Sequence, residues 1–141
     1  MEKFDFSKYS TLSDIGGGNA NLCLAVARKY ENMNCKNFDL PPVAEYANGK
    51  ISDAGMDESV SAVAGNMLED DYPTSDVICM SLIIHEWTLE TKVKLVQKSF
   101  NALNSGGIFI NIENMIDADR RTNLDSLLWS QGIRLGTGEG F

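Results

Sequence analysis

A run of glycines between two aspartates has the residue types and spacing of a nucleoside site. Asp14 stands shortly before Gly16, Gly17 and Gly18, at the end of an expected strand. Glycines at such a place allow a tight turn and let a ligand approach the backbone closely. Asp39 ends the next expected strand, where a carboxylate can accept hydrogen bonds from both ribose hydroxyls. Taken alone, Asp39 could equally cap the following helix, but the glycine run favours the ribose interpretation.

The same stretch does not match two common phosphate-binding motifs. It lacks the G-x-x-x-x-G-K-[ST] pattern, and Asn21 stands where G-x-G-x-x-G needs its last glycine. A carboxylate at Asp14 would repel a pyrophosphate but suits a ligand with a cationic group. Both features argue against a nicotinamide-dependent dehydrogenase. A nucleoside with a positive centre and no phosphate points to S-adenosylmethionine.

His85 is the only histidine of the chain and lies just past the end of the most apolar expected strand. A lone histidine is more often structural than catalytic. Its position at a carboxyl strand end, beside the expected cofactor, favours the catalytic interpretation. There it could serve as a general base that removes a proton from a substrate hydroxyl.

The elements that must position these residues alternate between strands and helices. The alternation predicts an α/β domain with a mostly parallel sheet and helices on both faces, which binds its ligand outside the carboxyl ends of the strands. One helix carries its lysines on one face and an apolar stripe on the other, formed by Leu89, Val93, Val96, Phe100 and Leu103. The expected strands are 11–15, 34–40, 59–65, 76–84 and 108–113, and the expected helices are 20–30 with Asn19 as its cap, 41–50 ending near Gly49, and 89–103.

Composition narrows the class of ligand. The 141 residues predict one domain, and the net charge of −8 argues against nucleic acid or an anionic membrane as partner. The three cysteines, Cys23, Cys35 and Cys79, form no Cys-x-x-Cys pair, so we expect reduced thiols in a cytoplasmic protein and no metal site. Neither a signal peptide nor a membrane span is expected.

Five segments carry a family resemblance. DIGGGNAN, FDLPPV, VAGNMLEDDYP, SDVICMSLIIHEW and ALNSGGIFINIEN follow one another in this order. Together they resemble the class I, Rossmann-like O-methyltransferases that act on small molecules, such as the plant caffeate and hydroxyindole O-methyltransferases. The resemblance runs from about residue 4 to residue 130. It implies transfer of a methyl group from S-adenosylmethionine to a hydroxyl of a small phenolic or hydroxyindole-like acceptor. The alternative is a non-catalytic remnant that binds the cofactor or a partner chain.

The resemblance also implies a set of cofactor-binding residues. The loop Gly16 to Gly18 would pass under the methionine part, and Leu40 would pack at the adenine beside the ribose-binding Asp39. Asn66, in place of the usual aspartate, and Met67 would flank the adenine. Ser81 stands where many members have a lysine near the cofactor.

For catalysis, the resemblance implies His85 as the general base, within the sequence His85-Glu86-Trp87. Glu113 matches the acid that orients this histidine, and Trp87 is expected to serve packing. A second family carboxylate is either Glu139 or falls just past the end of the sequence.

Members of the family are longer than this chain. The expected unit is a methyltransferase domain over residues 1–141, with the family's N-terminal dimerisation domain and its C-terminal end, including the final strands, absent. We expect cofactor binding to survive in such a chain better than turnover. The acceptor cannot be identified from these residues, and a homodimer is one of the expected assemblies.

Overall fold

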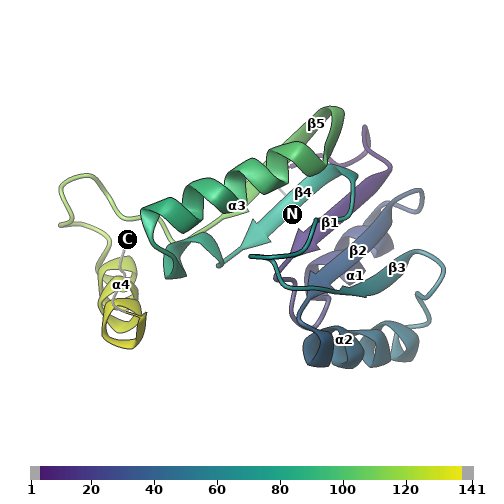
Figure 1. Ribbon diagram of the computed structural model, residues 1–141, viewed down its shortest axis with the longest axis horizontal. Coiled ribbons are helices and arrows are strands. Elements are labelled where there is room, and N and C mark those ends of the chain that lie inside the picture. Colours follow the sequence, from purple (N-terminus) through teal and green to yellow (C-terminus); the bar gives the residue numbers. More distant parts are fainter. Residues whose placement is uncertain (1–3, 138–141) are drawn as a thin grey trace.

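Five parallel strands form a single sheet in the computed structural model, which describes residues 4–137 (Figure 1). The sheet has the order β3-β2-β1-β4-β5, and each neighbouring pair is parallel. The chain moves outward from β1 to β3 and then returns to the other side of β1 for β4. The carboxyl ends of β1 and β4 therefore meet where the winding reverses, which is the usual ligand site of such sheets. The strands are β1 (Thr11–Ile15), β2 (Asn34–Asp39), β3 (Val60–Ala64), β4 (Ser75–Ser81) and β5 (Leu103–Ile112).

Helices cover both faces of the sheet. Helices α1 (Asn21–Lys29) and α2 (Pro41–Asp53) contact β1, β2 and β3, whereas α3 (Leu89–Ala102) contacts β4 and β5. Right-handed crossovers that run in opposite directions from β1 place the two groups on opposite faces, as Figure 1 shows. The predicted α/β architecture is thus confirmed. A fourth helix, α4 (Leu124–Thr137), follows β5 and was not assigned from the sequence.

Two apolar clusters fill the spaces between the sheet and its helices. Leu12, Val26 and Ile51 belong to the cluster beneath α1 and α2, and Ile78 and Leu95 to the cluster beneath α3. The three cysteines are free and buried, as the sequence predicted. No helix among residues 4–137 has the length and the apolar composition that crossing a bilayer requires.

Several element boundaries differ from the sequence-based prediction. Asn19 does not cap α1, because Ala20 occupies that position with a left-handed φ of 62° and makes no side-chain cap bond. Helix α2 continues through Gly49 to Asp53, since its last turn buries Ile51 against the sheet. Strand β4 ends at Ser81 instead of residue 84, because the left-handed φ of 57° at Leu82 takes the chain out of the sheet.

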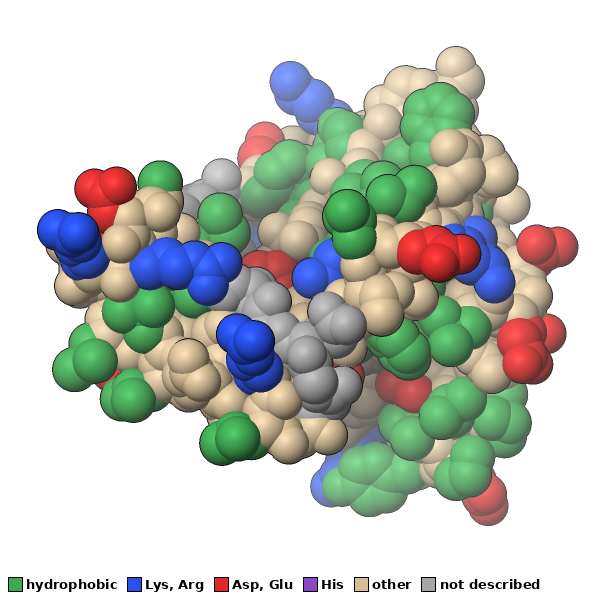
Figure 2. All heavy atoms as spheres, turned by 60° about the vertical axis from the view of Figure 1, so that its left-hand side comes forward, with side chains coloured by type: hydrophobic (Ala, Val, Ile, Leu, Met, Phe, Trp, Pro, Cys, Tyr) green, Lys and Arg blue, Asp and Glu red, His purple; other side chains and the backbone are tan. Residues whose placement is uncertain are grey.

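The predicted apolar stripe of α3 is present on the helix, but it does not pack against the sheet. Leu89 and Phe100 are 77% and 70% exposed, and Val93 is also exposed. The helix instead turns Leu95, Ser99 and Ala102 toward the sheet. Small residues allow the helix backbone to approach the strands closely, so the stripe with the larger side chains remains outside. Figure 2 shows apolar side chains among the charged groups of the surface.

Strand β5 begins directly where α3 ends. The sequence predicted residues 104–107 as a terminating loop and the strand from 108, but the strand already starts at Leu103. An irregularity in the β4–β5 register, between Ser75 and Val77, accommodates the extra residues. Beyond it the register is regular and ends with Ser81 opposite Ile112. This last pair brings the segments after β4 and β5 together.

Candidate active site

The glycine loop connects β1 to α1 at the point where the winding of the sheet reverses. Gly16 and Gly18 have φ of +71° and +56°, a conformation that favours glycine. A Cβ atom on Gly16 would clash with the side chain of Ile83, and one on Gly17 would clash with Asn37 Oδ1. The loop therefore presents bare backbone toward the carboxyl ends of β1 and β4.

Asp39 is bonded to this loop. Its Oδ2 accepts a hydrogen bond from the Gly18 N–H at 2.9 Å, and its Oδ1 accepts one from the Leu40 N–H at 2.7 Å. Asn37 adds a third link, because its Nδ2 donates to the Gly18 carbonyl at 3.0 Å. The N-cap residue of α2 is Leu40, without a side-chain cap bond. Asp39 therefore does not cap α2, and its carboxylate faces the loop.

Asp14 lies beneath the loop with 2% of its surface exposed. Burial, together with the charge of Asp39, raises the pKa of its carboxyl to about 7. Within residues 4–137, Asp14 Oδ1 and Asn37 Oδ1 are buried side-chain oxygens without a hydrogen-bond partner. Two unpaired acceptors at one place are costly, and a donor or a cation in the site would satisfy them.

A cavity of about 270 Å³ opens beside Asp39. It brings together Asp39, Leu40, Asn66 and Met67, four residues that the sequence analysis assigned to the cofactor. The Asn66 side chain also stabilises its own turn, because Oδ1 accepts the Leu68 N–H at 3.0 Å. Ser81, at the end of β4, is partly buried and does not line this cavity. The residues that line it are Phe38, Asp39, Leu40, Gly65, Asn66, Met67, Leu68 and Trp87.

Trp87 and Phe38 are lining residues that the sequence analysis missed. Trp87 was expected to serve packing, and it forms part of the cavity wall together with Asp39. The only sequence signal for Phe38 as a lining residue is its position directly before Asp39. Neither residue belongs to a spacing pattern that could indicate which side of the chain it faces.

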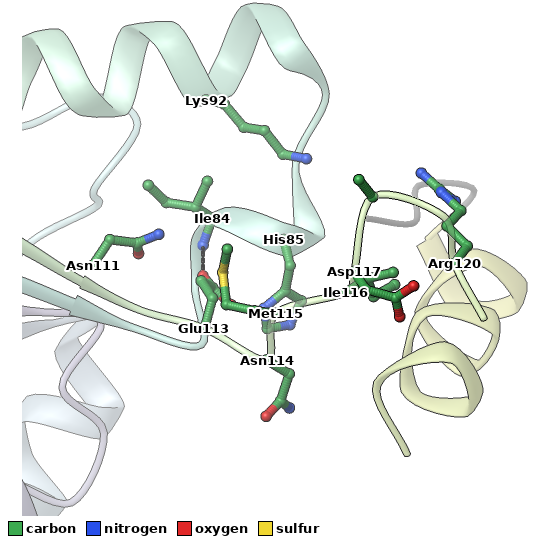
Figure 3. Close-up of a pocket in the computed structure, with 11 residues that line it drawn as sticks. Ile84, His85, Lys92, Asn111, Glu113, Asn114, Met115, Ile116, Asp117 and Arg120 are labelled. Carbon is green, nitrogen blue, oxygen red and sulfur yellow. Dashed lines mark hydrogen bonds and ion pairs between the residues drawn. The ribbon is translucent and has the colours of Figure 1, made fainter. Parts of the chain in front are cut away.

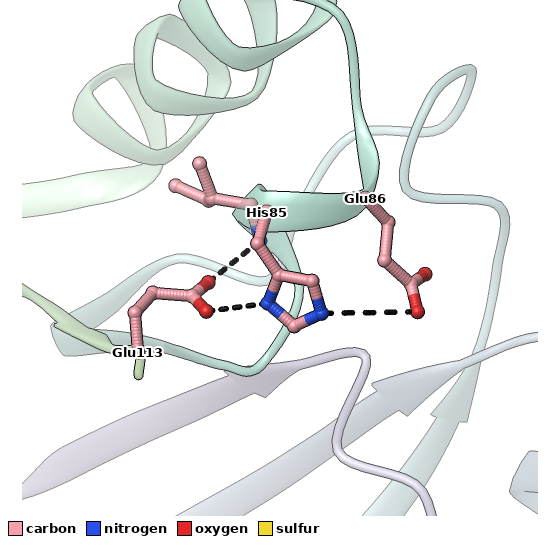
Figure 4. Close-up of polar contacts among 4 residues, drawn as sticks. His85, Glu86 and Glu113 are labelled. Atoms are coloured by element: carbon pink, nitrogen blue, oxygen red, sulfur yellow. Dashed lines mark hydrogen bonds and ion pairs between the residues drawn. The ribbon is translucent and has the colours of Figure 1, made fainter. Parts of the chain in front are cut away.

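Buried His85 and partly buried Glu113 form a pair just after the ends of β4 and β5 (Figure 4). The distance from His85 Nδ1 to Glu113 Oε2 is 2.5 Å, and Glu113 Oε1 accepts the Ile84 N–H at 2.9 Å. The His85 residue is 4% exposed and lies in a short 3₁₀ turn, η1 (Ile84–Glu86). A carboxylate at Nδ1 fixes the tautomer with the proton on Nδ1, so that Nε2 carries the lone pair.

The Nε2 side of His85 faces α4. Glu86 Oε1 lies 4.0 Å from Nε2, and the ring of Trp129 packs edge-on with its centroid 6.4 Å from that of His85. A cavity of about 590 Å³ opens here and is lined in part by Glu86, Asp125 and Leu128. His85 itself does not line this cavity, which is connected to it through Glu86.

A further cavity, of about 380 Å³, lies next to Glu113 (Figure 3). Lys92 from α3 and Arg120 from the segment before α4 line it together with Asn111 and Met115. His85 and Glu113 themselves also line this cavity. Glu139, the expected second carboxylate, lies outside the described residues.

The chain is similar to known O-methyltransferases over nearly its whole length. Acetylserotonin O-methyltransferase of Bos taurus is 31% identical over 137 residues, which cover 97% of this chain and 39% of the relative. Tetracenomycin polyketide synthesis 8-O-methyl transferase TcmO of Streptomyces glaucescens is 29% identical over 136 residues, which cover 96% of this chain and 40% of the relative. The chain thus spans about two fifths of the length of these relatives.

Solved structures agree with this similarity. Human N-acetylserotonin methyltransferase in complex with S-adenosylmethionine superposes with a TM-score of 0.89 at 27% identity, covering 99% of this chain and 39% of the human one. PigF with S-adenosylhomocysteine superposes with a TM-score of 0.90 at 25% identity, covering 99% of this chain and 47% of the PigF chain. The PigF sequence that matches this chain is from Serratia. The family model of the O-methyltransferase domain matches residues 1–139. The chain therefore belongs to the O-methyltransferase domain family.

Proposed function

We propose that this chain binds S-adenosylmethionine between the glycine loop and the 270 Å³ cavity and transfers its methyl group to a hydroxyl of a small acceptor, with His85 as the general base. The observation that carries the proposal is the His85–Glu113 pair, which closely follows Ile83, a residue whose side chain lies against the glycine loop. The solved human and PigF relatives hold the methyl donor or its product.

The residues present fit the cofactor. Its cationic methionine part would find the unpaired oxygens of Asp14 and Asn37, which need a donor or a positive charge. Each Asp39 oxygen already accepts one backbone N–H and retains a second acceptor position for a ribose hydroxyl. The adenine would enter the cavity between Leu40, Met67 and Trp87.

When bound, S-adenosylmethionine supplies a methyl group on a positively charged sulfur, activated for attack by an oxygen nucleophile. The contribution of this chain is to prepare that oxygen. His85 Nε2 would take the proton of the acceptor hydroxyl as the new carbon–oxygen bond forms and the methyl carbon–sulfur bond breaks, and Glu113 would stabilise the resulting imidazolium at Nδ1. A positioned base of this kind contributes about 10²–10⁴-fold to the rate.

The acceptor would approach from the α4 side. Glu86, whose Oε1 lies 4.0 Å from His85 Nε2, lines the 590 Å³ cavity, which has apolar walls from Leu128 and Trp129. An aromatic acceptor fits such walls, and this supports a small phenolic or hydroxyindole-like molecule. Methyl transfer to an oxygen is also what the relatives from Bos taurus and Streptomyces glaucescens are named for.

Cofactor binding is tested by calorimetric titration with S-adenosylmethionine, with NAD as the control ligand. Saturable binding of the first ligand alone, lost in Asp39→Ala, is the expected result. A folded chain that binds neither ligand would refute the proposal.

The catalytic step is tested with a panel of small phenols and hydroxyindoles and radiolabelled cofactor. His85→Ala is expected to lower the rate of transfer at least 100-fold while leaving cofactor affinity within about twofold, because His85 lies outside the cofactor cavity. Cofactor binding without transfer to any acceptor would instead favour the alternative, a non-catalytic domain that binds the cofactor.

A further inference from the structure

The turn between β3 and β4 forms one wall of the 270 Å³ cavity and has its own internal bonds. Asn66 N–H donates to Asp70 Oδ2 at 2.8 Å, and the Asp70 N–H donates to the Asn66 carbonyl at 2.8 Å. The Leu68 N–H is bonded to the Asn66 side chain. These bonds determine the shape of the turn, but they do not attach it to the rest of the domain.

Apart from the backbone bond from the Gly65 N–H to the Asp39 carbonyl, two side chains hold the turn, and both reach the same atom. Lys98 Nζ and Tyr72 Oη donate to the Met67 carbonyl oxygen at 2.8 and 2.9 Å. Lys98 Nζ also donates to the Asp70 carbonyl at 2.7 Å and lies 4.8 Å from the centre of the Tyr72 ring. Hydrogen bonds from a charged donor are stronger than neutral ones, and a cation over an aromatic face adds to them.

The partners of this arrangement reach the cavity from two directions. Tyr72 is buried, and its ring lies 5.6 Å from that of Phe38, which lines the cavity. Met67 extends its side chain toward the glycine loop, so that a Cβ atom on Gly16 would be 3.1 Å from Met67 Cε. Met67 thus has its carbonyl held from α3 and its side chain at the loop.

The position of Lys98 disfavours the charged form of its side chain. Burial and the neighbouring Lys94 lower the pKa of its ammonium group. The sequence pattern had placed this lysine with the others on the solvent face of the helix. Its head group instead turns to two backbone carbonyls, while the Lys94 side chain on the same helix is exposed. The two bonds of Lys98 therefore fix the turn relative to α3, and the bond of Tyr72 joins it to the segment that leads into β4.

We propose that Lys98 and Tyr72 are positioning residues for the cofactor, which hold Met67 and Asn66 in place against the adenine through the Met67 carbonyl. The inference rests on the proposed function, because it requires the nucleoside to occupy the cavity beside Met67. Neither residue lines that cavity, so both act through the turn. The consequence is a dependence of nucleoside recognition on a residue of α3, the helix that follows His85.

The test compares two ligands across five proteins by calorimetry. The ligands are S-adenosylhomocysteine and its inosine analogue, which lacks the exocyclic amine of adenine. The proteins are the wild type, Lys98→Met, Lys98→Arg, Tyr72→Phe and the matched control Lys94→Met. Lys98→Met keeps an apolar stem but removes all donors, whereas Lys98→Arg restores a charged donor, and Tyr72→Phe removes only the hydroxyl.

The expected result is a loss of about tenfold in affinity for S-adenosylhomocysteine in Lys98→Met and about threefold in Tyr72→Phe. The preference for the adenine ligand over the inosine analogue should fall in the same two variants. Lys98→Arg should recover most of the affinity, and Lys94→Met should match the wild type. A loss of thermal stability alone does not produce this difference between two ligands.

Two results would overturn the inference. One is an unchanged affinity of folded Lys98→Met and Tyr72→Phe for S-adenosylhomocysteine, and the other is an equal loss for both ligands. A wild-type chain that binds neither ligand would refute the proposed function itself, and this is visible before any variant is measured.

Discussion

Replacing Asp14 by asparagine should stabilise the ligand-free chain at neutral pH and weaken cofactor binding. Asp14 is almost fully buried, and its pKa is about 7 in the folded chain against an ordinary value of 3.8. The folded chain therefore retains a proton that the unfolded chain releases, throughout the range between about pH 4 and pH 7. Because the folded state binds more protons in this range, the free energy of unfolding falls as the pH rises.

The magnitude follows from the two pKa values. The difference between 3.8 and about 7 amounts to about 4 kcal/mol, since a tenfold change in a proton equilibrium is worth about 1.4 kcal/mol. Between pH 5 and pH 7.5 the free energy of unfolding of the wild type should fall by about 3 kcal/mol because of Asp14. The Asp14→Asn variant should show no such decrease. Asparagine can also donate a hydrogen bond, which the unpaired Asn37 Oδ1 can accept.

The assay is urea unfolding of the wild type, Asp14→Asn and the exposed control Glu58→Gln at several pH values from 5 to 8. The expected curves for wild type and Asp14→Asn are close at pH 5 and separate as the pH rises, with the variant more stable. The same variant should bind S-adenosylmethionine at least tenfold more weakly, because in the proposed site the Asp14 carboxylate would face the cationic part of the cofactor. Parallel pH profiles of the wild type and Asp14→Asn would refute the assignment of a raised pKa to this carboxyl.

Further predictions concern the loop and the amino-terminal end of the sheet. Gly17→Ala should abolish S-adenosylhomocysteine binding in calorimetry, because its Cβ would clash with Asn37 Oδ1, whereas Gly49→Ala, in open space within α2, should raise the free energy of unfolding by about 1 kcal/mol. Equal affinities of the Gly17→Ala and Gly49→Ala proteins would contradict the clash. Asp76 accepts hydrogen bonds from Ser10 and Thr11, so Asp76→Ala should cost about 2 kcal/mol in urea unfolding at pH 7. Hydrogen bonds from Asn104 and Ser10 hold the Asp76 pKa below its ordinary value, so this difference should shrink as the pH falls below about 4; a difference that stays constant down to pH 2 would argue against an ionised Asp76.

Local sequence patterns were sufficient for the order of the elements and for the residues at strand ends. A buried parallel strand is apolar on both faces, and its carboxyl end is followed at once by the loop that contacts the ligand. Asp14, Asp39 and His85 could therefore be assigned to one edge of the sheet before their distances were known. The glycine loop was recognisable for the same reason, since its conformation is a property of neighbouring residues.

Contacts between distant segments were decided by the tertiary structure. The helical spacing of apolar residues did not indicate that α3 would turn Ser99 and Ala102 toward the sheet and leave Leu89 exposed. Which face packs on the sheet depends on how closely the helix can approach the strands. The two donors to the Met67 carbonyl lie on either side of β4 in the sequence, and Trp87 meets Asp39 only after β1 and β4 have paired.

The sequence by itself thus determined the α/β class, the glycine loop and the chemistry of single side chains, because these depend on short stretches of chain. The tertiary structure decided the close contact between His85 and Glu113, the role of Trp87 in the cavity wall and the attachment of Lys98 to the turn. Each of these requires the register of the sheet and the direction in which a helix faces. Those two quantities depend on the packing of the whole domain.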